Sequence, residues 1–119
     1  MAKEGCELGA HTVTHRDLTA LTRVEVEREI KDSVRSIEDL VGDAVVTFAY
    51  PKGRWDPSIR TIVGAEGFDV ACTVQEGHVP SDPDILALPR VSVLKATTLA
   101  QFRAKISRGL ALYERIMGR

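Results

Sequence analysis

Residues 22–50, TRVEVEREIKDSVRSIEDLVGDAVVTFAY, carry a helical pattern followed directly by a buried-strand pattern. The helical apolar positions are Val26, Ile30, Val34, Ile37 and Val41. Thr22 and Glu25 form a capping box at the start of this segment, and Gly42 is a natural stop. The run AVVTFAY that follows is almost entirely apolar and rich in β-branched residues, which is typical of a strand buried on both faces of a parallel sheet. The stretch therefore predicts a helix that leads into a parallel strand.

The same alternation continues to the end of the chain. Asp56 and Pro57 are suited to open a second helix that stops near Gly67, and FDVACTV (68–74) predicts the next strand. A polar loop, 75–84, leads to a short predicted strand, ALPRVSV (87–93), and Thr98 with Gln101 caps a last helix. The apolar face of that helix is expected to carry Leu99, Phe102, Ile106, Leu110, Tyr113 and Met117. Strands that alternate with helices predict one α/β domain over residues 1–119 with a parallel sheet.

Composition excludes several classes of partner. Sixteen basic and seventeen acidic residues give a net charge of −1, and both signs are scattered, so we expect no nucleic-acid partner. The sequence has no apolar run of signal-peptide length and none near the ~20 residues that cross a bilayer, so we expect no membrane partner and a cytoplasmic location. Cys6 and Cys72 lack CxxC spacing, which predicts two reduced, buried thiols.

Two polar loops each follow a predicted strand. They are GAHTVTH (9–15) and YPKGRWD (50–56), and loops after the carboxyl ends of parallel strands commonly carry the chemistry of such folds. His11 and His15 are candidate metal ligands, although zinc at a catalytic site normally takes three protein ligands and a water. The alternative is that both are loop histidines that hydrogen-bond to nearby backbone.

Read together, GCELGAHTVTH, TFAYPKGRWD, FDVACTV and LPRVSV resemble the polysaccharide deacetylase family, the NodB-homology domain of carbohydrate esterase family 4. The resemblance runs from about Gly5 to about Arg103. It implies a distorted (β/α) barrel and a divalent metal, commonly zinc, held by one Asp and two His that match His11 and His15. It also implies metal-dependent hydrolysis of N-acetyl groups on N-acetylated sugars or polysaccharides of the chitin or peptidoglycan type. Thr12 matches a position whose hydroxyl braces the loop.

The resemblance also suggests roles for residues outside the histidine loop. Lys52, where the family usually has Tyr, would donate its backbone N–H to the oxyanion, and Arg90 would supply the charge that orients a catalytic Asp. Tyr50, Pro51 and Trp55 are expected to contact the substrate. The alternatives are a solvated loop lysine for Lys52, a surface strand end for Arg90 and simple packing for Trp55.

One departure from the family pattern is large. Its T-F-D-D-G motif, which supplies the base Asp and the metal-binding Asp, has no match in Met1 to Ala10. We therefore expect a partial barrel that lacks its N-terminal strands, binds metal weakly and is inactive alone, with Asp17 first in line should a replacement ligand exist. The alternative is a non-catalytic remnant or an α/β interaction domain with weak metal or glycan binding. Unpaired strand edges near CELGA (6–10) and RVSV (90–93) predict a homodimer.

Overall fold

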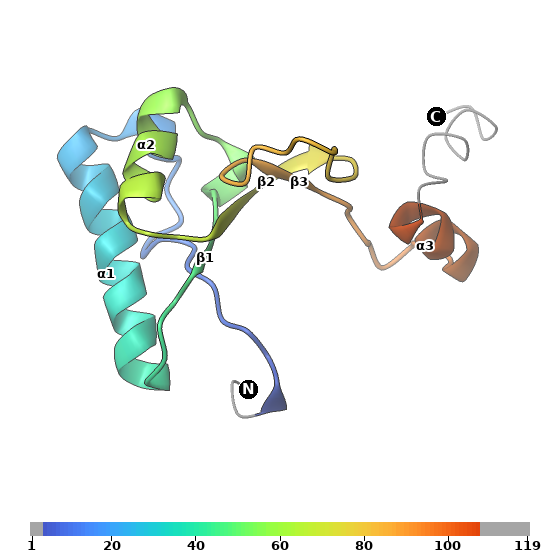
Figure 1. The fold of residues 1–119 in the computed structure, drawn as a ribbon, viewed down its shortest axis with the longest axis horizontal. Helices are drawn as coiled ribbons and strands as arrows, with labels where there is room; N and C mark the ends of the chain where they lie inside the picture. The colour runs from blue at the N-terminus through green and yellow to red at the C-terminus, as the bar shows by residue number, and fades with distance from the viewer. Residues whose placement is uncertain (1–3, 108–119) are drawn as a thin grey trace.

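The structure is a computed structural model that describes residues 4–107, and Figure 1 shows the arrangement of its elements. The helices are α1 (Arg23–Val41), α2 (Pro57–Ala65) and α3 (Leu99–Ile106), with short 3-10 turns η2 (Leu18–Ala20) and η3 (Pro51–Gly53). The strands are β1 (Thr47–Ala49), β2 (Val70–Glu76) and β3 (Leu88–Arg90). Helices and strands alternate as the sequence predicts.

All strand pairings in the described sheet are parallel, and the strand order is β1-β2-β3. Phe48 of β1 lies opposite Ala71 of β2, and Cys72 lies opposite Leu88 of β3. On the other side of β1, Ala10 makes a parallel bridge to Phe48, with its N–H 2.8 Å from the Thr47 carbonyl oxygen. The predicted α/β class with parallel strands is confirmed, and the predicted strand at 6–10 is reduced to this single bridge.

The sheet and the helices α1 and α2 enclose the hydrophobic core. The two helices contact each other and lie together on one side of the sheet in Figure 1. The most deeply buried aliphatic side chains are Leu18, Val26, Ile30 and Val63. Each such side chain contributes roughly 1.5–3 kcal/mol relative to an exposed position, so the helical stripe identified in the sequence also anchors this half of the molecule.

Local capping signals place the helix ends correctly. The Thr22 side chain accepts from the N–H of Glu25, whose carboxylate accepts from the Thr22 N–H, so the predicted capping box is present. Gly42 ends α1 with φ 83°, a left-handed conformation that favours glycine. Asp56 caps α2 through the N–H of Ile59, with Pro57 at the first helical position.

The strand limits differ from the prediction. The strand predicted over residues 44–50 is only three residues long, because the N–H of Val45 donates to the Glu38 carboxylate at 2.8 Å and is unavailable to the sheet. Conversely, β2 continues to Glu76, two residues into the predicted loop. The hydrogen bond from Val45 to the Glu38 side chain, seven residues earlier on α1, contributes to the first difference and is not revealed by the strand pattern.

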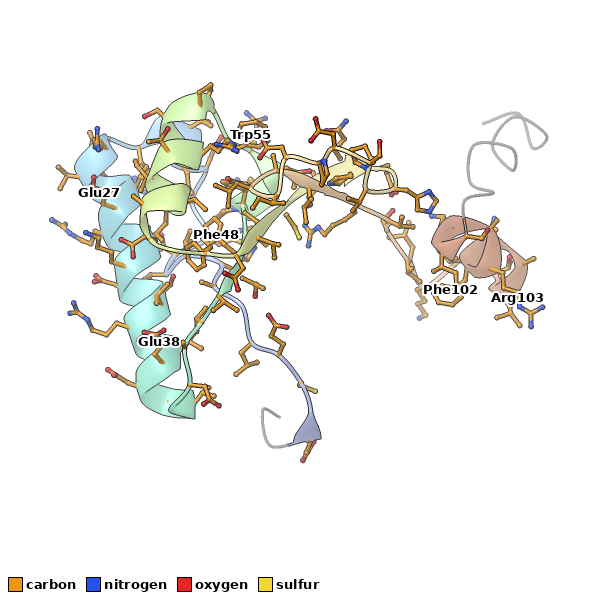
Figure 2. All side chains as sticks on the ribbon, in the orientation of Figure 1. Glu27, Glu38, Phe48, Trp55, Phe102 and Arg103 are labelled. Atoms are coloured by element: carbon orange, nitrogen blue, oxygen red, sulfur yellow. The ribbon has the colours of Figure 1, made fainter. Side chains whose placement is uncertain are left out.

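Helix α3 stands apart from the core. The predicted Thr98 and Gln101 capping box is present, but the helix ends at Ile106, where Ser107 is extended; Leu110, Tyr113 and Met117 lie outside the described residues. Its apolar residues Leu99 and Ile106 are 64% and 61% exposed. Figure 2 shows Phe102 and Arg103 on this helix, away from Phe48 and Trp55 in the main body. The radius of gyration, 16.3 Å, exceeds the ~13.5 Å expected for a compact domain of this length.

Two further expectations have clear outcomes. Both cysteines are free thiols, as predicted, but Cys6 is exposed and Cys72 only half-buried, so the expectation of two buried thiols is wrong. Cys6 precedes the Ala10 bridge and lies on backbone that is not paired in the sheet, which explains its exposure. Within residues 4–107, no helix has the length and apolar character needed to span a membrane.

Candidate functional site

The two histidines of the HTVTH loop lie side by side at the carboxyl end of the sheet. The loop follows Ala10, the residue that bridges to β1, and the ring centroids of His11 and His15 are 4.6 Å apart with a tilt of 59°. No helix connects the two residues. Instead, left-handed backbone conformations at Thr12 (φ 67°) and His15 (φ 58°) turn the chain back on itself and bring the rings together.

Several hydrogen bonds hold this unusual loop. The N–H of His15 donates to the Thr12 hydroxyl at 3.1 Å, as expected for a residue that braces the loop. The N–H and the hydroxyl of Thr14 both donate to one carboxylate oxygen of Glu29 on α1, each at 2.9 Å. A β-branched residue with positive φ is costly and persists only where its surroundings impose it. These bonds impose it, and they tie the histidine loop to helix α1.

One nitrogen of His11 is already engaged. Its Nδ1 lies 2.6 Å from the carbonyl oxygen of Ala49, the last residue of β1. A carbonyl oxygen only accepts hydrogen bonds, so Nδ1 carries a proton, and in the neutral form of the ring the lone pair is on Nε2. This is the arrangement usual for a metal-binding histidine, in which a backbone carbonyl fixes the tautomer and the ring orientation.

An open cavity of about 220 Å³ adjoins His11, with Gly9, Thr47, Cys72 and Arg90 in its lining. The Arg90 side chain is exposed, and its Nε donates to the carbonyl oxygen of Thr73 on β2 at 2.6 Å. The backbone of Gly9 passes close to β1, since a Cβ there would lie 2.5 Å from the Thr47 hydroxyl. His11 and Arg90, which are far apart in the sequence, therefore line the same cavity.

The second polar loop forms the turn η3 after β1. Lys52 has a left-handed backbone (φ 57°, ψ 13°), and its side chain is exposed. Its N–H donates to no acceptor within the part of the chain that the structure describes, whereas the N–H groups of Gly53 and Arg54 donate to Tyr50 and Pro51 carbonyls. Lys52 thus presents both a backbone donor and an ammonium group at the end of the sheet that bears the histidines.

Tyr50 and Pro51 are correctly placed in the chain but their side chains do not face a site. Both are fully buried, and the Tyr50 hydroxyl donates to the Leu86 carbonyl oxygen at 2.7 Å. Burial raises the pKa of Tyr50 to about 12. The Trp55 ring stacks on the Tyr50 ring with centroids 6.1 Å apart and packs against the core. Neither the Tyr50 nor the Pro51 side chain is open to a substrate in this structure, and Trp55 is partly buried against Tyr50; substrate contact by these residues stays a prediction.

Asp17 is occupied by structural interactions. Its carboxylate accepts from the N–H and hydroxyl of Thr19 and meets Nη1 of Arg54 at 3.5 Å. The hydrogen bonds from Thr19, with Arg54 and Lys52 nearby, lower the pKa of Asp17 below its usual range. Within residues 4–107 no group of three His, Cys, Asp or Glu side chains is placed to hold a metal ion. Asp17 therefore does not complete a three-ligand set in this structure.

Sequence reasoning missed three partners that shape the site. They are Glu29, the Ala49 carbonyl group and Arg54. Glu29 lies fifteen residues from Thr14 on a helix face rich in charged residues, and nothing local distinguishes it from its neighbours. The Ala49 carbonyl could have been anticipated, because the last carbonyl of a strand often lies within reach of the loop after its parallel neighbour.

Comparison with known proteins identifies the class. A family model described as polysaccharide deacetylase matches residues 1–71, which is more than half of the chain, and the chain belongs to that family. YxkH of Bacillus subtilis is 26% identical over 106 residues, covering 89% of this chain and 38% of the relative. A chitooligosaccharide deacetylase of Sinorhizobium fredii is 29% identical over 104 residues, covering 87% and 46%. The chain thus spans less than half the length of these curated relatives.

Solved structures agree with this assignment. A polysaccharide deacetylase from Bacillus cereus superposes with a TM-score of 0.79 at 29% identity, covering 89% of this chain and 34% of that one. The Streptococcus pyogenes deacetylase PplD, solved in complex with acetate, gives a TM-score of 0.79 at 23% identity, covering 83% and 44%. The fold is therefore a partial NodB-type α/β fold, as the sequence predicts.

Proposed function

We propose that this chain provides part of the active site of a metal-dependent hydrolase that removes N-acetyl groups from N-acetylated sugars or polysaccharides. His11 and His15 would hold the divalent metal, with zinc the best match to two imidazole donors. The observation that carries the proposal is the pairing of the two rings, 4.6 Å apart, with Nδ1 of His11 held by the Ala49 carbonyl and Nε2 left to bind.

The surrounding residues suit this chemistry. A bound divalent metal supplies Lewis acidity toward an acetyl carbonyl and lowers the pKa of a bound water. The N–H of Lys52, which donates to no acceptor in residues 4–107, would serve as a hydrogen-bond donor for a developing oxyanion. Arg90, which borders the cavity beside His11, adds a positive charge that can orient an acidic group supplied there. Neither role requires the buried side chains of Tyr50 and Pro51.

A second candidate function is binding without catalysis. It is favoured by the lack of any three-ligand cluster of His, Cys, Asp or Glu in the 4–107 region. Two imidazoles bind zinc more weakly than a full ligand set, and Asp17, the carboxylate two residues after His15, is engaged by Thr19 and Arg54. We therefore propose that the 119-residue chain binds metal and glycan weakly and does not hydrolyse the amide by itself.

Acetate release from N-acetylated chito-oligosaccharides tests this function. We expect no detectable release by the 119-residue chain with zinc present, and release once a segment bearing T-F-D-D-G is joined to it. In the joined protein, His11→Ala should lower the rate by about 100-fold or more, because losing a metal ligand should cost at least as much as the roughly 10–100-fold lost with an outer-shell partner. Chelator-sensitive release of acetate by the short chain would contradict the proposal that this chain does not hydrolyse the amide by itself. Full activity in the joined His11→Ala variant would contradict the metal role.

We also propose that two copies of the chain associate through exposed sheet edges. In the described region, the sheet ends at the Ala10 bridge on one side and at β3 on the other. Unpaired edges with few charges recruit other strands, and symmetric dimers are the commonest closed assembly. Light scattering at micromolar concentration should give about twice the monomer mass of 13.0 kDa. A monomer mass across that range would contradict the proposal.

A further inference from the structure

Two basic side chains lie on the loop beside the histidines. Arg54 contacts Asp17, two residues after His15, with Nη1 3.5 Å from Oδ2. Lys52 lies two residues before Arg54, inside the turn η3. Lys52 also follows Ala49, the acceptor of the His11 hydrogen bond, by three residues. The two cations and the two imidazoles therefore share one end of the sheet.

The positive charge of Lys52 is not neutralised by an ion pair. Within residues 4–107 its ammonium group lies within 4.0 Å of no carboxylate, and the side chain is exposed. Asp17 is shared between Thr19 and Arg54, whose side chain remains 66% exposed. The nearby Glu29 carries a negative charge, but it lies on α1, where one oxygen accepts both bonds from Thr14. Lys52 is thus an exposed cation on this loop with no ion-pair partner in residues 4–107, and it is available to an incoming anion.

The backbone holds Lys52 in a fixed place. Pro51 is buried on one side, and on the other side Gly53 lies so close to β2 that a Cβ would be 2.3 Å from a methyl group of Val74. A charge on a flexible loop contributes less to binding free energy, because ordering the loop costs entropy, whereas a charge on a fixed backbone avoids that cost. The Lys52 side chain is exposed, and the packing of Pro51 and Gly53 fixes its point of attachment beside the site.

We propose that Lys52, with help from Arg54, makes this site prefer N-acetylated sugars that carry a carboxylate on a neighbouring residue over neutral N-acetylated sugars. This inference rests on the proposed function, since it assumes that the glycan binds at the histidine end of the sheet. A carboxylate within about 4 Å of an exposed ammonium gains roughly 1 kcal/mol, which is about a five-fold change in affinity.

A pair of defined oligosaccharides tests the preference. Tetra-N-acetylchitotetraose is neutral, whereas a hyaluronan tetrasaccharide alternates N-acetylglucosamine with glucuronate and so offers the same acetamide beside a carboxylate. Each is titrated into the zinc-loaded 119-residue chain and followed by calorimetry or by NMR shifts. We expect hyaluronan to bind about five-fold more tightly at low salt, and the difference to vanish at about 1 M salt, where the screening length is ~3 Å.

Two variants assign the effect to residues. Lys52→Gln should bring the two affinities close together by weakening hyaluronan binding alone, and Arg54→Gln should reduce the preference in part. Lys31→Gln is the matched control, because it removes the same charge from α1, where Lys31 pairs with Glu66 at 3.7 Å. Its preference should equal that of the unmodified chain.

The outcomes separate the two proposals. Equal binding of both oligosaccharides, or an unchanged preference in Lys52→Gln, would overturn the charge inference and leave the proposed glycan site intact. Binding of neither oligosaccharide with zinc present would contradict the glycan site itself and both proposals with it. A preference for the neutral oligosaccharide would also overturn the inference, since repulsion would then outweigh the charge of Lys52.

Discussion

Zinc titrated into the 119-residue chain is expected to bind with a dissociation constant on the order of 0.1 mM, and His11→Ala is expected to abolish that binding. Two imidazoles are half of a four-ligand structural site, so we expect about half of the binding free energy of such a site. His11 is the more sensitive of the two, since its Nδ1 bond to the Ala49 carbonyl orients the ring before the metal arrives. Isothermal calorimetry or a competing chelating dye measures the constant.

A third histidine provides the control for the zinc experiment. His78 is bonded through Nε2 to the Lys105 carbonyl oxygen, 2.7 Å away, beside helix α3. His78→Ala should therefore leave zinc affinity unchanged, while His15→Ala should weaken zinc binding, though less than His11→Ala does. Equal losses from His78→Ala and His11→Ala would mean that zinc binds nonspecifically. An unaffected affinity in His11→Ala would remove that residue from the site.

Gly53→Ala is expected to lower the free energy of unfolding by about 3 kcal/mol, a large part of the stability of a small domain. Two costs add here. The left-handed backbone (φ +69°) disfavours a residue with a Cβ by roughly 1–2 kcal/mol. The new methyl group would also lie 2.8 Å from the backbone nitrogen of Val74, and crowding of this kind costs a further 1–3 kcal/mol, roughly.

Gly67→Ala separates these two costs. Gly67 has a similar backbone angle (φ +86°), but a Cβ there would meet nothing within 4 Å. Its substitution should therefore cost only the backbone component, roughly 1–2 kcal/mol. Urea unfolding at one fixed protein concentration compares the variants, because association would otherwise change the apparent stability. Equal losses at the two positions would show that the approach of β2 to the η3 turn is not tight.

Signals within a few residues of one another predicted the structure well. The Thr22 and Glu25 capping box, the Asp56 cap and the Gly42 stop all depend on groups within one helical turn, and each is found where the sequence puts it. The alternation of helices and strands gave the fold class for the same reason. Strand limits were less accurate, since the pairing of Val45 is lost to Glu38, a residue on another element.

Contacts between distant residues could not be predicted. Tyr50 is buried with its hydroxyl bonded to the Leu86 carbonyl oxygen, 36 residues away, whereas the loop sequence alone made the ring look available to substrate. The periodicity from Leu99 to Ile106 correctly predicted a helix, but not that its apolar face is exposed, because periodicity does not say what covers a face. Likewise, the histidine motif indicated a candidate site, whereas Glu29 and the Ala49 carbonyl became visible only in three dimensions.

The two hydrogen bonds from Thr14 to Glu29 make the conformation of the histidine loop depend on the folding of the first turns of α1. Helix ends open locally at a lower free energy than whole domains unfold. If the turn around Glu29 opens, both of its bonds to Thr14 are lost, and the strained angles at Thr12 and His15 lose one of their supports. Part of the free energy that keeps the two imidazoles together therefore comes from the folding of helix α1. Ligand affinity is consequently linked to the folding stability of that helix.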